Sequence, residues 1–113
     1  MNKKKGLGLN DEALELIANR FRLLSEPMRL KILHTLGDRE MNVSEIVLRT
    51  GASQANVSKH LAALLDAAVV SRRKQGLTAN YRVTDVTIFE LCDAVCSRLK
   101  DQVRARQALL KTV

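Results

Sequence analysis

The segment from Ser53 onward has the pattern of a helix that begins at a capping residue and buries one side. Apolar residues follow at helical spacing on one face: Val57, Leu61, Leu64 and Ala68. Small, polar or charged residues fall opposite them: Ala55, Asn56, Lys59, Ala62, Ala63 and Asp66. The preceding residues 44–52 read as a short helix and a turn, in which Gly51 permits a tight bend. Together these segments predict a helix-turn-helix.

A basic β-hairpin is predicted directly after this motif. Residues 69–74 read as a strand, residues 75–78 as a turn around Gly76, and residues 79–84 as the return strand. Other helices are predicted from Asp11 to about Ser25, from Pro27 to Leu36, and from Asp85 to about Leu110. The expected fold class is mainly α with a small β-hairpin wing, a winged helix-turn-helix of four helices, two strands and a final helix.

The chain of 113 residues is expected to form one domain. Residues 1–9, with Lys3, Lys4 and Lys5, are expected to be a flexible basic tail, and residues 10–113 the domain itself.

The first and last predicted helices carry more apolar surface than a single chain needs. On the first helix, Leu16 and Leu23 form a second stripe opposite Leu14, Ile17, Phe21 and Leu24. A surface helix needs only one apolar stripe, so the second indicates a partner such as another subunit. The last helix has its own stripe, formed by Ile88, Cys92, Val95, Leu99 and Val103. No later segment follows to cover it, which favours a dimer.

Positive charge is concentrated in the middle third of the chain. The formal net charge is +7. Between residues 49 and 82 a single acid, Asp66, stands against six basic residues: Arg49, Lys59, Arg72, Arg73, Lys74 and Arg82. Five of the seven net charges therefore lie there, as expected for a protein that binds a polyanion such as DNA. Charge alone is also compatible with a solvated surface.

Several other classes of protein are disfavoured. No apolar run approaches a membrane span, and the N-terminal lysines are not followed by the apolar stretch of a secretory signal. The expected location is the cytoplasm, where cysteines are reduced by default. A Gly-rich phosphate loop, a His/Asp pair at sensible spacing and a carboxylate cluster are all missing, so an enzyme is not expected. The unbalanced charge argues against a module that binds only proteins.

The early turns of the second motif helix carry side chains suited to reading DNA. The predicted DNA contacts are Ser53, Gln54, Ala55, Asn56, Ser58, Lys59 and His60 on this helix and Arg72, Arg73 and Lys74 on the hairpin. Gln54 or Asn56 can pair with adenine through two hydrogen bonds, and Lys59 can reach a guanine or a phosphate. The hairpin cations would lie along the backbone or the minor groove. For the two serines and the histidine, capping or local hydrogen bonding remains an alternative.

Three stretches of the chain together resemble the ArsR/SmtB family of bacterial winged-helix repressors. They are residues 24–33 (LSEPMRLKIL), residues 53–61 (SQANVSKHL), and Tyr81, Arg82 and Val83 at the end of the hairpin. The resemblance covers roughly residues 12–99. It implies a homodimer built on the first and last helices, which places two recognition helices on double-stranded, palindromic operator DNA. It also implies repression that an inducer relieves.

The inducer sites usual in this family are not expected here. Its arsenic site uses a cysteine pair on the third helix, and residues 40–45 contain no thiol. Its zinc-type site needs acids and histidines on the last helix. Asp85 and Asp101 could supply the acids, but Thr87 and Arg98 stand where histidines are needed. Its persulfide sensors have a cysteine on the second helix, and this chain has none there.

Cys92 and Cys96 lie one helical turn apart and form the remaining candidate sensor site. Two such thiols can chelate one soft ion, for example As(III), Cd(II) or Cu(I), with a third ligand from a second subunit. A redox signal is the other chemistry, through an intersubunit disulfide, because a bridge within one straight helix is unfavourable. Apart from such an inducer no cofactor is expected. Alternatively, the cysteines fill the core, and a DNA-binding regulator without a metal or redox sensor is controlled by protein level or a protein partner.

Overall fold

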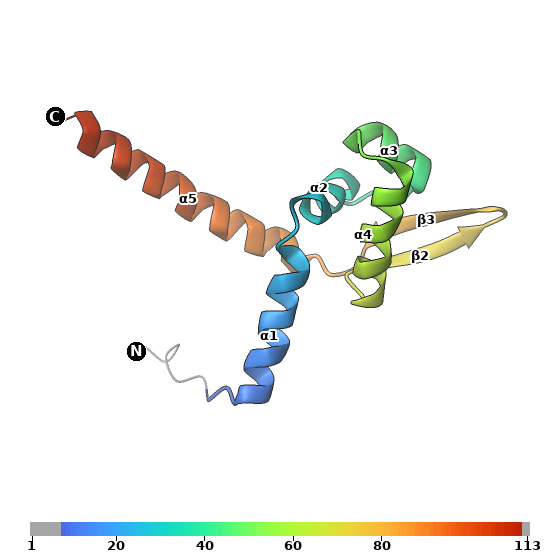
Figure 1. The fold of residues 1–113 in the computed structure, drawn as a ribbon, viewed down its shortest axis with the longest axis horizontal. Helices are drawn as coiled ribbons and strands as arrows, with labels where there is room; N and C mark the ends of the chain where they lie inside the picture. The colour runs from blue at the N-terminus through green and yellow to red at the C-terminus, as the bar shows by residue number, and fades with distance from the viewer. Residues whose placement is uncertain (1–7, 112–113) are drawn as a thin grey trace. The chain divides into compact units, whose positions relative to one another are not determined.

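The computed structural model describes residues 8–111 and divides after Val83 into two units. Most of the predicted basic tail, residues 1–7, lies outside the described residues. The first unit contains α1 (Asp11–Leu24), α2 (Pro27–Leu36), β1 (Met41–Asn42), α3 (Val43–Thr50), α4 (Gln54–Asp66), β2 (Val70–Gln75) and β3 (Thr78–Val83) (Figure 1). In the second unit the helix α5 extends from Thr87 to Lys111. The predicted fold class is confirmed.

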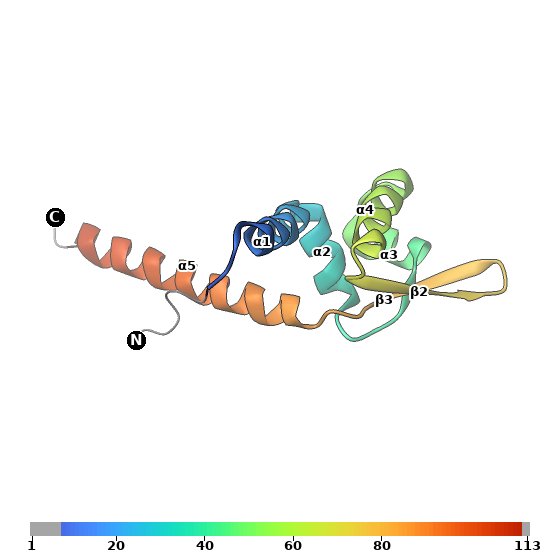
Figure 2. The ribbon, with the colours of Figure 1, turned by 90° about the horizontal axis from the view of Figure 1, so that it is seen from below.

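The sheet contains one strand that the sequence pattern did not predict. Residues 38–41 are expected to be a plain connection, but Met41 and Asn42 form the short strand β1, which pairs antiparallel with β3. The strand order is therefore β1-β3-β2. The central strand of the sheet is β3, and through this strand the hairpin pairs with β1. Beyond this anchor, β2 and β3 extend past α3 and α4 as a wing (Figure 2).

Side-chain caps mark the starts of α3 and α4. Asn42 and Glu45 form a capping box, in which the Asn42 side chain accepts from the Glu45 amide at 2.9 Å and the Glu45 carboxylate accepts from the Asn42 amide at 3.0 Å. The Ser53 hydroxyl accepts from the Asn56 amide at 3.1 Å, so α4 begins where expected. Gly51 ends α3 in the left-handed conformation at φ 76°, which a residue with a Cβ adopts only at a cost.

The core of the first unit lies between α2, α3, α4 and the base of the sheet. Its fully covered side chains are Ile32, Leu33, Leu36, Ile46, Val57, Leu61, Leu64, Val69 and Val70. The apolar face predicted for α4 is confirmed as far as Leu64. Ala68, predicted to continue this face, is instead exposed, because α4 ends at Asp66 and Ala68 takes a left-handed φ of 60°.

Both terminal helices keep large apolar side chains in solvent. On α1 the exposed set is Leu14, Leu16, Ile17 and Phe21. On α5 it is Val95, Leu99, Val103, Leu109 and Leu110. Among the helices of residues 8–111, none combines the length and the apolar character that crossing a membrane requires.

Candidate nucleic-acid interface

The first two turns of α4 present most of the predicted DNA-contacting side chains to solvent. Ser53, Gln54, Ala55, Ser58 and Lys59 are exposed, and Asn56 is half-buried. The hydroxyl of Ser53 is already occupied as the helix cap, so this residue also fulfils the structural role considered for it. The exposed α4 surface combines amide, hydroxyl and ammonium groups with a small methyl side chain, which allows close approach to a base edge.

His60 does not belong to this surface. Its side chain is only 4% exposed, and its Nδ1 atom accepts a hydrogen bond from Nε of Arg29 at 3.1 Å. Burial lowers the pKa of His60, and the positive charges of Arg29 and Lys59 lower it further, against a smaller opposing effect of Glu26. A neutral, covered imidazole cannot reach a phosphate. Between the two roles considered for His60, its burial favours the orientation of the helix over a DNA contact.

Arg29 is a positioning residue that the sequence reasoning missed. Besides its bond to His60 on α4, its Nη1 atom donates to the Leu23 carbonyl in the last turn of α1 at 3.1 Å. One guanidinium on α2 thus joins α1 and α4. The available signal was the position of His60 three residues after Val57, on the apolar face of α4, where a buried imidazole requires a donor.

The turn between α3 and α4 is held from two sides. Lys31 on α2 donates from Nζ to the Thr50 carbonyl at 3.0 Å, at the end of α3. The Thr50 hydroxyl donates to the Ile46 carbonyl at 2.8 Å and accepts from the Ala52 amide at 3.3 Å. These bonds fix the direction in which α4 leaves the turn, and hence where its exposed side chains lie.

The wing carries its predicted cations on two different faces. Successive side chains of a strand alternate between faces. Arg72 lies opposite Tyr81 and Lys74 opposite Ala79, so both cations share one face, while Arg73, opposite Asn80, lies on the other. All three cations are exposed. The structure therefore brings Arg72 and Lys74 together and separates Arg73 from them.

Arg73 is paired with Glu40, a residue that the sequence reasoning did not single out. The Glu40 Oε1 atom accepts from Nη2 of Arg73 at 2.7 Å and from Nε at 3.3 Å. This hydrogen bonding lowers the pKa of Glu40, and the charges of Arg73 and Arg82 add to the shift, against partial burial. Arg82 lies opposite Ser71, on the same face of the hairpin as Arg73.

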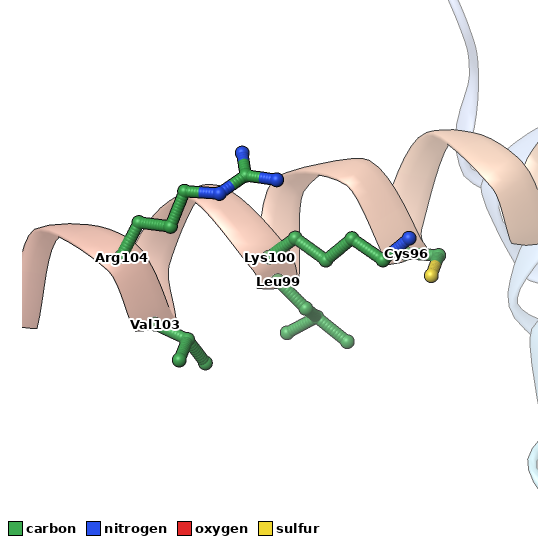
Figure 3. A pocket seen from close by; sticks show the side chains of 5 residues that line it. All are labelled: Cys96, Leu99, Lys100, Val103 and Arg104. Atoms are coloured by element: carbon green, nitrogen blue, oxygen red, sulfur yellow. The ribbon is translucent and has the colours of Figure 1, made fainter. Parts of the chain in front are cut away.

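The thiols of α5 are both free, with Cys92 half-buried and Cys96 exposed. Cys96 borders a shallow hollow of about 310 Å³ along the helix, lined also by Leu99, Lys100, Val103 and Arg104 (Figure 3). Leu99 and Val103 project to the same side of the helix. Within residues 8–111, no three or more His, Cys, Asp or Glu side chains gather as they would around a metal ion.

The two acids considered for a zinc-type site have local partners instead. Asp85 accepts from the amide of Thr87, the first residue of α5, at 3.2 Å. Asp101 accepts from Arg104 at 3.2 Å, one turn further along the same helix.

Comparisons with known proteins agree with this geometry. Residues 26–72 match the family model described as bacterial regulatory protein, arsR family. The chain is similar to the HTH-type transcriptional regulator KmtR of Mycobacterium tuberculosis, with 38% identity over 77% of this chain and 68% of that protein. It is also similar to a probable mercury resistance operon repressor of Streptomyces lividans, with 39% identity over 63% of this chain and 57% of that protein.

A solved structure resembles this chain over most of its length. It is the solution structure of the homodimeric winged helix-turn-helix DNA-binding domain of Mb0332 from Mycobacterium bovis, described as a possible ArsR-family transcriptional regulator. The TM-score is 0.69 at 26% identity, and the match covers 86% of this chain and 93% of that one.

Proposed function

Because this chain belongs to the ArsR family of bacterial regulatory proteins, we propose that it binds a palindromic operator as a homodimer and represses transcription. The observation that carries this proposal is the exposed surface of α4 beside a cationic wing. The partly buried Arg29–His60 bond and the Lys31–Thr50 bond support it, since they hold α4 in one orientation.

In this complex α4 enters the major groove. Gln54 or Asn56 pairs with an adenine edge, and Lys59 reaches a guanine or a phosphate. Ala55 leaves room for close approach. Ser53 and Ser58 contact the phosphate backbone, and the wing cations add affinity that falls with salt.

The dimer uses the apolar faces of the terminal helices. Leu16 and Phe21 on α1 are 66% and 53% exposed, and Val95 and Leu99 on α5 are 50% and 54% exposed, so a second subunit has apolar surface to bury. The homodimeric description of Mb0332 supports a homodimer. A two-fold dimer presents two α4 helices, which requires half-sites about one helical turn apart.

The test is fluorescence-anisotropy titration with DNA from the region upstream of the protein's own gene, compared with scrambled DNA. We expect Asn56→Ala and Lys59→Gln to weaken specific binding by about 5-fold to 150-fold, as loss of a base or phosphate contact does. Lys111→Gln, at the far end of α5, is the charge-matched control. Equal binding of wild type and both α4 variants would contradict the proposal.

The inducer part of the proposal concerns Cys92 and Cys96. A thiophilic metalloid or metal such as As(III), or a redox signal, acts at this pair and releases the DNA. The exposure of Cys96 and the spacing of one turn support it, because soft ions prefer thiolates. One chain supplies two thiols, so a trigonal ion takes its third ligand from the second subunit.

The same titration with reduced protein and stoichiometric arsenite tests this part. Release of the wild type but not of the Cys92→Ser/Cys96→Ser variant supports a thiol sensor for arsenite. If neither protein responds to arsenite, soft metals, persulfide and oxidants are tested next. If the wild type ignores all of them, the protein is a DNA-binding regulator without a metal or redox sensor, controlled by its own level or by a protein partner.

A further inference from the structure

An acidic side chain lies against the wing, where a DNA-binding surface gains nothing from a negative charge. Glu40 stands one residue before β1, and β1 pairs with β3 through Met41 and Tyr81. Its carboxylate reaches Arg73 on β2, with the middle strand β3 between them. The two side chains are 33% and 56% exposed, so the pair lies at the surface.

Such a pair does little for folding. Exposed ion pairs contribute little to stability, because water screens them and both side chains lose freedom. Its larger effect is on the local field, since one carboxylate cancels the charge of one wing arginine. Two hydrogen bonds to Arg73 also occupy donors that a phosphate would use.

We infer that Glu40 keeps Arg73 from the DNA phosphates, so that the wing engages its operator through the opposite face, which carries Arg72 and Lys74. This inference rests on the proposed DNA-binding function. Within residues 8–111, neither Arg72 nor Lys74 takes part in an ion pair. Both are exposed, and they share one face of the hairpin. Glu40 is therefore a positioning residue that selects which wing face meets DNA.

Salt dependence of binding separates this inference from a merely structural role. Each phosphate contact contributes about 0.9 to the slope of log affinity against log salt concentration. Glu40→Gln frees Arg73, so the slope should steepen by about 0.9 and affinity at 0.1 M salt should rise about 5-fold to 10-fold. Arg72→Gln and Lys74→Gln should each flatten the slope by about 0.9.

The decisive variant is the double substitution Glu40→Gln/Arg73→Gln, which replaces a neutral ion pair by two neutral side chains. We expect it to bind with the slope and affinity of wild type. Asp38→Asn controls for the general loss of one negative charge and should leave the slope unchanged. Thermal melts confirm that every variant is folded.

Two results would overturn the inference. If the double variant flattens the salt dependence of binding as much as Arg72→Gln does, Arg73 contacts a phosphate in the wild-type complex. If Glu40→Gln behaves like Asp38→Asn, the carboxylate exerts no specific restraint. Wild-type protein that binds neither operator nor scrambled DNA would refute the proposed function itself, and this inference with it.

Discussion

Replacing Arg29 by methionine should destabilise the first unit more than the same replacement of an exposed arginine. The guanidinium donates to His60 on α4 and to the Leu23 carbonyl on α1, both at 3.1 Å. Hydrogen bonds with a charged donor contribute about 1.5–3 kcal/mol each, and Arg29 is only half-buried, so the lower part of this range applies. The expected loss is about 2–4 kcal/mol, a large share of the roughly 5–15 kcal/mol typical of a domain.

The assay is urea denaturation followed by circular dichroism, at about pH 7.5 and a fixed protein concentration. Arg39→Met is the matched control, because Arg39 is exposed and, within residues 8–111, its side chain donates only to the Thr35 carbonyl of the preceding helix α2. Its cost should stay below about 0.5 kcal/mol. Equal transition midpoints for the two variants would refute the role assigned to Arg29.

A double-mutant cycle with His60→Leu measures the Arg29–His60 interaction itself. Methionine at position 29 leaves the buried Nδ1 of His60 without a donor, which accounts for part of the cost. His60→Leu should therefore cost less in the Arg29→Met background than alone, with a coupling energy of about 1–2 kcal/mol. Additive effects would show that the bond contributes little.

Three further outcomes are expected. Burial lowers the pKa of His60, so on acidification the imidazole of the unfolded chain is protonated before that of the folded chain. The free energy of unfolding therefore keeps its full value above about pH 6.5. Below this pH it falls by at most about 1.4 kcal/mol per pH unit. His60→Asn, which retains an acceptor, should flatten this dependence in urea titrations down to about pH 5.5. Ala68→Gly should raise stability in thermal melts by about 0.5–1 kcal/mol, since φ is 60° there, whereas Ala62→Gly within α4 should lower it by about 1 kcal/mol. Asn42→Ala should lower the free energy of unfolding by about 1 kcal/mol in chemical denaturation, because the capping box is lost. Asn42→Asp should retain most of this stabilisation.

The elements of the fold could be predicted because their signals are local. A capping residue at Ser53, a glycine at position 51 and the apolar spacing along α4 act within a few residues of one another, and each appears in the structure as expected. The two-residue strand β1 could not be predicted in this way, because it is too short for an alternating pattern. It exists through its pairing with β3, almost forty residues later in the chain.

Site residues on outward faces could be placed from the sequence, whereas those whose environment depends on distant contacts could not. Lys59 and Arg72 are charged residues on outward faces, so helix and strand periodicity were sufficient to place them. The burial of His60 depends on Arg29, 31 residues away, and the charge of Arg73 is offset by Glu40, 33 residues away. Neither partner is visible in a local pattern, because only the folded chain brings them together.

If the proposed dimer covers the apolar faces of α1 and α5, the stability of this protein depends on its own concentration. Subunits that associate only when folded are stabilised by mass action, so dilution alone shifts the equilibrium toward unfolding. A separated subunit leaves side chains such as Phe21 and Leu99 in water, and chaperones and proteases act on surfaces of this kind. In the proposed dimer, a subunit without its partner is therefore the form most exposed to such removal.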